Sequence, residues 1–307
     1  MNAGGTAPRI VGIGAIFIDD IVLPDGRTHM AQPGGGVLHA LMGAALWDER
    51  PGIVAPVGQG LPDEVRALLE AHFDTRGLVQ LPIPQIRAWQ IFEDDGTRRE
   101  LFRVRETEPF TRGAQPEHLP EVYRGSQGYY LLQGFDDIRT WSHTLSGLVL
   151  WEPLQQVMLL ENREPMRAVL RECRIDVISP NLVEAQAVYG ALTPDELLTA
   201  FFDDGAQIVA LRMGEQGSLL GRRATGERQY IPAFPVHQVV DQTGAGNTYC
   251  GGLLCGLVNG KTLAEAGAAA AVAASFCIEG VGALRANSIQ RAERDRRFRQ
   301  IQQYSRA

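Results

Sequence analysis

Short apolar runs alternate with stretches of helical periodicity along most of the chain. The apolar runs lie at 10–16, 53–58, 128–132, 148–151, 177–179 and 207–212, and the clearest helical stretches lie at 166–173 and 264–278. Short strands that alternate with helices are typical of a parallel sheet with right-handed crossovers. We therefore predict an α/β fold, with a doubly wound, mainly parallel sheet and helices on both of its faces.

A different pattern occupies residues 85–105. Apolar and polar residues alternate from Gln85 to Glu93, Asp94–Thr97 form a turn, and alternation resumes from Glu100 to Val104. This pattern predicts a β-hairpin. Residues 17–23 also look like a strand, and Val236–Val240 like another.

The composition is that of a soluble globular protein with a substantial core. The chain has 307 residues, of which 45% are hydrophobic and 21% charged. It shows no internal repeat or low-complexity linker, so we expect one main domain over 1–307. The four cysteines are scattered, which favours reduced, buried thiols over zinc or disulfides.

Charge and hydropathy narrow the class of partner. The net charge of −7 argues against nucleic-acid binding, although backbone amides and local arginines can still bind an anionic small ligand. No charged start is followed by a long apolar run, so neither export nor membrane insertion is indicated. We expect a cytoplasmic protein that acts on a small molecule.

The most informative stretch is the glycine-rich segment 241–252, which leads into an apolar helix pattern at 253–258. Gly244 and Gly246 let the backbone turn sharply and approach a ligand closely. The amides of residues 244–247 then lie at a helix N-terminus, where unpaired N–H groups and the helix dipole favour an anion. The segment predicts a phosphoryl-transfer site.

This segment resembles the C-terminal signature of the ribokinase-like (PfkB) family of sugar and nucleoside kinases, usually Asp-Thr-Thr-Gly-Ala-Gly-Asp. The chain reads Asp-Gln-Thr-Gly-Ala-Gly-Asn from 241 to 247. The resemblance implies that the amides of Gly244, Ala245, Gly246 and Asn247 bind the γ-phosphate of ATP. Asn247 stands where the family has its catalytic base, and Asn cannot accept a proton at neutral pH.

Two further motifs resemble the substrate side of that family. Gly12 and Gly14 end the first strand, and Asp19 matches an Asp that hydrogen-bonds sugar hydroxyls. Gly34 and Gly35 match a glycine pair that feeds a helix, but His39 stands where the family usually has Asn. His39 is either a substrate residue or a packed helix residue. Gly58-Gln59-Gly60 replaces the family's usual Gly-Asp-Asp.

The remaining motifs concern metal and nucleotide. Asn181 and Glu184 match an Asn-x-x-Glu pair that organises Mg²⁺ and its waters in the family. They equally suit a helix cap, with Glu184 reaching back to the N-cap. The resemblance assigns Arg212, Gly214 and Gly217 to the nucleotide loop, together with the signature residues Asp241 and Thr243. The loop 280–283 would share a monovalent-cation site, such as one for K⁺, with residues near Asp241.

The resemblance also implies a small β-sheet lid over the sugar, formed by segments near 17–32 and 86–105. Trp89, Phe102, Arg103 and Arg105 are candidate lid contacts. Such lids also form dimer faces, so a homodimer through the lid is compatible with the sequence. The Arg-rich tail at 291–299 predicts a solvated terminal helix.

Three interpretations of Asn247 remain open. In the first, which we prefer, the chain is a working kinase in which water, His39 or another carboxylate takes the proton. The second is a pseudokinase that binds a nucleotide or a sugar. In the third, position 247 was substituted deliberately.

Overall fold

A nine-stranded sheet forms the centre of the computed structural model, which describes residues 6–47, 49–94 and 98–304. Its strands, in spatial order, are β13 (Glu227–Ile231), β12 (Ser218–Arg222), β11 (Ile208–Arg212), β10 (Val177–Ile178), β9 (Leu148–Pro153), β8 (Gly128–Gln133), β1 (Ile10–Ile13), β4 (Gly52–Gln59) and β5 (Asp74–Pro84). Neighbouring strands run parallel from β11 to β5, whereas β12 and β13 add an antiparallel hairpin at one edge. The mainly parallel sheet predicted from the periodicity is confirmed.

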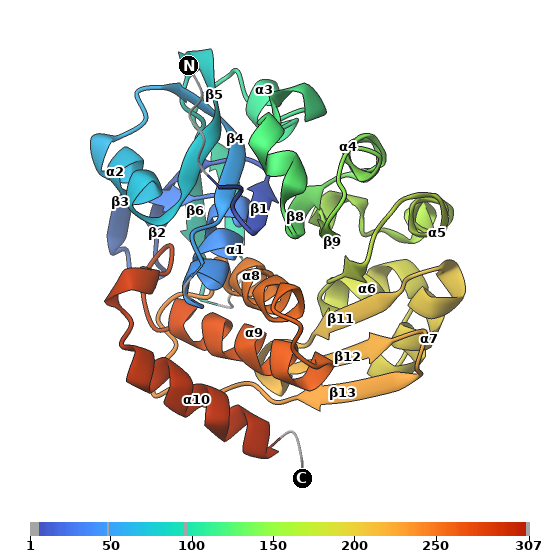
Figure 1. The fold of residues 1–307 in the computed structure, drawn as a ribbon. Coiled ribbons are helices and arrows are strands. Elements are labelled where there is room, and N and C mark those ends of the chain that lie inside the picture. Colours follow the sequence, from blue (N-terminus) through green and yellow to red (C-terminus); the bar gives the residue numbers. More distant parts are fainter. Residues whose placement is uncertain (1–5, 48, 95–97, 305–307) are drawn as a thin grey trace.

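Helices cover both faces of this sheet (Figure 1). One face packs against α1 (Gly36–Ala45), α2 (Asp63–His72), α8 (Ala245–Val258), α9 (Leu263–Cys277) and α10 (Arg291–Tyr304). The other face packs against α4 (Phe135–Ser142), α5 (Arg163–Glu172), α6 (Leu182–Tyr189) and α7 (Pro194–Asp204). The short helices are α3 (Glu108–Thr111), η1 (Pro116–His118), η2 (Glu121–Gly125), η3 (Gln155–Val157), η4 (Leu160–Asn162), η5 (Gly214–Gln216) and η6 (Ala286–Ser288). Two hydrophobic cores result, one on each face of the sheet.

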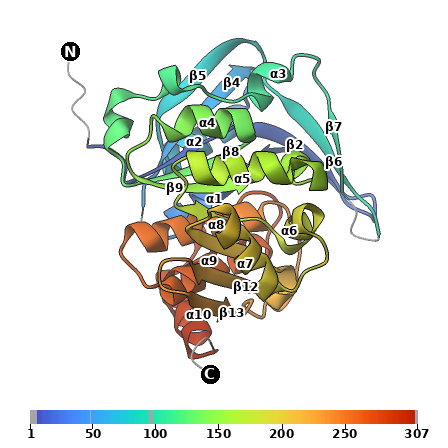
Figure 2. The same cartoon turned by 90° about the vertical axis from the view of Figure 1, so that its right-hand side faces the viewer.

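A separate four-stranded sheet forms the lid. Its order is β3 (Thr28–Gly34), β2 (Phe17–Val22), β6 (Arg87–Phe92) and β7 (Arg98–Phe102). The two outer pairs are antiparallel, while β2 and β6 run parallel. Figure 2 shows this sheet reaching away from the main body on the right. The predicted hairpin β6–β7 is confirmed, and most of its predicted turn, 95–97, lies outside the described residues.

Glycines allow α8 to lie directly against α1. A Cβ at Gly251 would overlap the carbonyl oxygen of Ala40, and a Cβ at Gly43 would overlap that of Thr248. Larger residues at these positions would push the two helices apart. The small residues after the glycine-rich signature therefore bring the start of α8 close to the start of α1.

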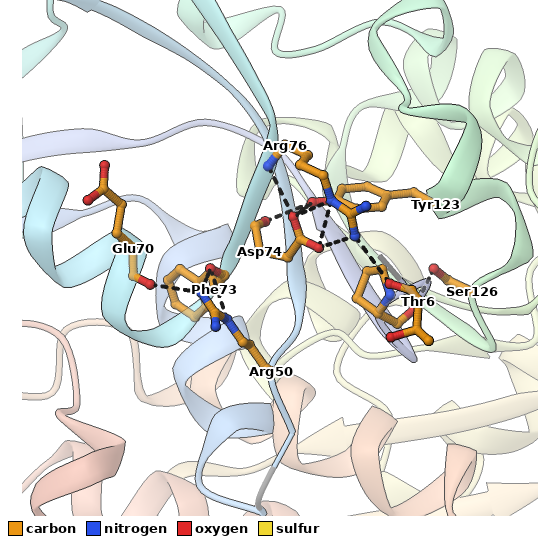
Figure 3. Close-up of polar contacts among 9 residues, drawn as sticks. Thr6, Arg50, Glu70, Phe73, Asp74, Arg76, Tyr123 and Ser126 are labelled. Carbon is orange, nitrogen blue, oxygen red and sulfur yellow. Dashed lines mark hydrogen bonds and ion pairs between the residues drawn. The ribbon is translucent and has the colours of Figure 1, made fainter. Parts of the chain in front are cut away.

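A polar cluster fastens the opposite, amino-terminal end of the sheet (Figure 3). The hydroxyl of Tyr123 donates to Asp74 Oδ1 at 2.7 Å, and Arg76 pairs with the same carboxylate. Arg50 donates to the carbonyls of Glu70 and Phe73, where α2 ends, at 3.1 and 3.3 Å. This cluster contains none of the residues predicted for the site.

Two sequence predictions are wrong. Residues 236–240 form no strand; Val239 and Val240 are exposed, and the Val240 amide donates to the Ile278 carbonyl at 2.7 Å. The Arg-rich tail does form a helix, α10, but Arg294 and Arg297 on it are buried against the main body.

Candidate active site

The polar residues at the strand ends gather at the carboxyl edge of the main sheet. Glu152 lies near the end of β9, Arg212 ends β11, and Asn181 is the N-cap of α6 just beyond β10. The start of α8 lies over the same edge, because a Cβ on Gly246 would overlap Nη1 of Arg212. Ligands bind at this edge in open α/β sheets.

Asp241 holds the loop that opens α8. Its Oδ1 accepts a hydrogen bond from the Thr243 amide at 2.8 Å, and its Oδ2 accepts one from the Gly282 amide at 3.0 Å. Gly244, the N-cap of α8, has a left-handed backbone with φ of 73°. The loop therefore ties the glycine-rich signature to the segment that follows α9.

The four amides predicted to bind an anion all lie at this helix start. The amide of Ala245 donates to the Gln242 carbonyl at 3.2 Å, so it takes part in the turn itself. The first turn of any helix leaves several amides without intrahelical partners. The anion-binding role of residues 244–247 stays a prediction. The Ala245 amide already has a hydrogen-bond partner within the turn.

Asn247 joins two parts of the site. Its Nδ2 donates to Oε2 of Glu152 at 3.0 Å and to the hydroxyl of Tyr130 at 3.3 Å. The same Nδ2 faces the start of α1, where a Cβ added to Gly36 would lie 2.9 Å away. Residue 247 therefore contacts both the predicted substrate loop and a carboxylate of the main sheet.

Arg212 is buried between two carboxylates. Its Nη1 lies 2.9 Å from Glu152 Oε1, and its Nη2 lies 3.8 Å from Glu184 Oε2. Nη2 also donates to the Ser179 carbonyl at 2.8 Å. Burial alone would lower the pKa of Arg212, but the Glu152 and Glu184 carboxylates outweigh burial and raise it. Arg212, which we predicted to belong to the nucleotide loop, thus points toward the carboxylates of Glu152 and Glu184.

Asn181 and Glu184 form the predicted helix cap. The Glu184 amide donates to Asn181 Oδ1 at 2.8 Å, and the Asn181 amide donates to Glu184 Oε2 at 2.9 Å. Burial raises the pKa of Glu184, although Arg212 and the Asn181 amide act in the opposite direction. Carboxylate and amide oxygens are ligands that suit Mg²⁺ and its waters. This donor set therefore fits the predicted metal as well as the cap.

The predicted substrate residues lie at the base of the lid and at the start of α1. Asp19 is 4% exposed, and its Oδ1 accepts a hydrogen bond from Gln90 at 3.1 Å. Gly34 packs so closely on Asp19 that a Cβ there would overlap the carboxylate, and Gly35 has φ of 95°. These three residues are brought together.

His39 lies beside the loop that opens α8. Its side chain is 2% exposed, and a Cβ on Gly244 would overlap its ring. The carbonyl of His39 accepts a hydrogen bond from the Thr248 hydroxyl at 3.2 Å. The His39 ring therefore packs against the loop that opens α8, and its contact with a substrate stays a prediction.

The predicted nucleotide-loop glycines follow directly after Arg212. Gly214 begins η5 and Gly217 follows it, with φ of 60° and 86°, and the Met213 amide donates to the Gly217 carbonyl at 2.8 Å. The glycines permit this tight turn. Their contact with a nucleotide stays a prediction.

Sequence reasoning gave no role to Glu152 or Tyr130. Their hydrogen bond, from the Tyr130 hydroxyl to Glu152 Oε2, is 2.7 Å long and buried. The position of Glu152 at a strand end was the available signal, because such residues converge in parallel sheets. Among the described residues, no group of three or more His, Cys, Asp and Glu side chains is arranged to hold a metal ion.

Comparisons with known proteins agree with this geometry. A model of the pfkB family of carbohydrate kinases matches residues 154–290. The chain is 26% identical to the cytidine kinase of Thermococcus kodakarensis over 262 residues, which cover 83% of this chain and 91% of that one.

Solved structures share the fold over almost the whole chain. An E. coli protein provisionally named ribokinase II, in complex with ATP and Mg²⁺, has a TM-score of 0.79 at 18% identity and covers 95% of this chain and 99% of its own. The adenosine kinase of Sinorhizobium meliloti has a TM-score of 0.76 at 22% identity, and the match covers 90% of this chain and 95% of that one. The fold of this chain is the one that these kinases have.

None of the helices in the described part of the chain combines the length and the apolar character that a membrane span needs.

Proposed function

We propose that this chain is a ribokinase-like, PfkB-type carbohydrate kinase that transfers the γ-phosphoryl group of ATP to an alcohol group of a small molecule. The contact between Asn247 and Gly36 carries the proposal, since it joins the predicted acceptor loop to the helix start predicted to bind phosphate. Phosphoryl transfer depends mainly on positioning and charge stabilisation, which such a junction supplies.

The acceptor we propose is a sugar or a nucleoside. The cytidine kinase relative matches over 91% of its own length, which supports a nucleoside. Asp19 and Gln90, hydrogen-bonded to each other at the base of the lid, provide an acceptor and a donor for sugar hydroxyls.

The cofactors we propose are ATP and Mg²⁺. Asn181 and Glu184 would orient the metal and its waters, while the metal would neutralise charge on the phosphates. Gly214 and Gly217 would let the backbone approach the nucleotide. A monovalent cation near Asp241 is a further proposal, supported by the way this carboxylate links the signature loop to Gly282.

The test is ATP-dependent phosphorylation across a panel of nucleosides and sugars that includes cytidine, adenosine and ribose, followed by mass spectrometry of the product. We expect the parent protein to form product. If the parent forms none while Asn247→Asp does, the protein is a nucleotide- or sugar-binding pseudokinase, and the kinase proposal is wrong. A rise in melting temperature with ATP alone would show binding of ATP and not phosphoryl transfer, so it does not support the kinase proposal.

We also propose that two copies pair through the lid. Met30 and Leu101 on the lid are 43% and 54% exposed, which supports an apolar contact there. Sedimentation velocity would show a dimer that Leu101→Asp converts to a monomer. A parent that sediments as a monomer would contradict this assembly.

A further inference from the structure

Glu152 supplies a carboxylate beside the position where the family's base is missing. Its Oε2 is 3.0 Å from Nδ2 of Asn247, although the two residues are far apart in sequence. A general base typically contributes about 10²–10⁴-fold to a rate, and the Asn247 amide cannot serve as one. A working kinase with this sequence therefore needs another proton acceptor within reach of the acceptor hydroxyl.

The identity of residue 247 fits the presence of Glu152. Two carboxylates about 3 Å apart repel each other, and one of them then binds a proton at neutral pH. Asn247 instead donates a hydrogen bond to Glu152, so the pair holds a single carboxylate. Asn at 247 and Glu at 152 are thus a matched pair, and Asp at 247 would disturb Glu152.

Rigid elements of the main sheet hold Glu152 in place. Tyr130, on β8, donates to Oε2 at 2.7 Å, and Arg212, on β11, lies 2.9 Å from Oε1. Tyr130 is fully buried, and Glu152 is 5% exposed. A carboxylate oxygen has two lone-pair sites, and Tyr130 and Asn247 fill both of those on Oε2, so an acceptor hydroxyl binds Oε2 in place of the Asn247 amide.

We propose that Glu152 is the proton acceptor of the reaction and that Asn247 is a positioning residue beside it. This inference rests on the proposed kinase function. The acceptor hydroxyl oxygen forms a bond to the γ-phosphorus of ATP while the bond from that phosphorus to the β–γ bridging oxygen breaks. The electron pair leaves with ADP, and the hydroxyl proton goes to Glu152, directly or through one water.

The charged and titratable groups around Glu152 come from four elements. They are Tyr130 on β8, Glu184 on α6, Arg212 on β11 and Cys250 on α8. Burial, reinforced by the Glu152 carboxylate, raises the pKa values of both Tyr130 and Cys250, so these two groups stay neutral. Arg212 balances the charge of one of the two carboxylates.

The experiment compares the parent with Glu152→Gln, Asn247→Asp and the double variant that exchanges the two functional groups. We measure kcat for the best acceptor of the panel and the rise in melting temperature with ATP. Glu152→Gln should lower kcat by about 10²–10⁴-fold and keep the ATP-dependent rise. The double variant restores a carboxylate next to the acceptor loop and should regain at least ~10-fold over Glu152→Gln.

The control is Glu172→Gln on α5. Glu172 pairs with Arg139 at 2.6 Å, away from the site, so this variant removes a carboxylate–arginine pair without touching the proposed acceptor. It should keep the parent's kcat.

Other outcomes separate the two proposals. An active parent whose Glu152→Gln variant keeps its kcat overturns the inference and leaves the kinase function standing. A double variant as slow as Glu152→Gln assigns the loss to unpaired Arg212 and also overturns the inference. A parent that is inactive with every acceptor overturns the kinase function itself.

Discussion

Arg212 and Glu152 form an ion pair of 2.9 Å whose side chains are only 12% and 6% exposed. The pair connects the ends of β11 and β9 under the first turn of α8. A buried ion pair adds little net stability by itself, but removing one partner leaves an uncompensated charge. The pair therefore fixes how the ends of β9 and β11 lie in the site. Substitution of either partner should lower the stability of the protein.

Arg212→Met should lower the free energy of unfolding by about 3–5 kcal/mol, because Glu152 is left charged and buried without its guanidinium. Urea denaturation at pH 7 measures the change. The control is Arg139→Met, which breaks the exposed pair with Glu172 and should cost less than about 1 kcal/mol. Equal losses of unfolding free energy in the two variants would show that the burial of an ion pair does not determine how much its removal destabilises the protein.

Asp20 in the lid gives a pH-dependent contribution to stability. Its carboxylate is buried and pairs with both Arg87 and Arg103. Burial alone would raise the pKa of Asp20, but hydrogen bonds from Arg87, the Ala31 amide and Arg103 together outweigh it and lower the pKa to about 2. A carboxyl whose pKa is lower in the folded state stabilises the protein at neutral pH and loses this contribution as the pH falls through the folded pKa.

We expect Asp20→Asn to lower the free energy of unfolding at pH 7 by about 2 kcal/mol, the equivalent of the pKa shift. The difference between parent and variant should shrink as the pH falls from about 4 to about 2. Urea denaturation at pH 7, 4 and 3 measures it. A difference that stays constant over this range would contradict the assignment to Asp20.

The elements of the site were predictable from the sequence, but their contacts were not. Glycine and small-residue spacing predicted the turn at Gly244 and the helix after it. The hydrogen bond between Asn247 and Glu152 joins positions 95 residues apart. Periodicity places each residue on its own element, whereas this contact depends on how α8 docks over β9.

The two wrong predictions have physical causes. Val239 and Val240 have strand-favouring side chains, but the chain there pairs with the end of α9 rather than with the sheet. The arginines of α10 looked solvated because their aromatic partners lie elsewhere in the sequence. The guanidinium of Arg297 is 3.8 Å from the ring centroid of Phe276, and that of Arg294 is 4.9 Å from that of Trp47.

Arg297 should contribute far more to stability than its neighbour Arg296. Arg297 donates to Ser275 Oγ at 2.9 Å and pairs with Glu279 at 2.8 Å, with its side chain 9% exposed. Arg296 is 52% exposed and pairs with Glu293. Thermal unfolding of Arg297→Ala should show a loss of about 3 kcal/mol, and Arg296→Ala a much smaller one. Similar losses would mean that α10 is not anchored through Arg297.

Gly244 and Gly260 form a matched pair for testing the loop that opens α8. Both have left-handed backbones, with φ of 73° and 69°. A Cβ on Gly260 would meet nothing within 4 Å, whereas one on Gly244 would overlap the ring of His39. The two Gly→Ala variants therefore share the backbone strain and differ in the overlap.

Gly260→Ala should cost about 1–2 kcal/mol of unfolding free energy, the strain of a left-handed alanine, and keep kcat. Gly244→Ala should cost more and lower kcat by about 10²-fold, because the overlap displaces the loop that we predict to bind phosphate. Removing the ring in Gly244→Ala/His39→Ala should recover the extra loss of stability, since the strain then remains and the overlap does not. Urea denaturation and the kinase assay together measure these effects. Equal stability losses for Gly244→Ala and Gly260→Ala would show that His39 does not support the loop.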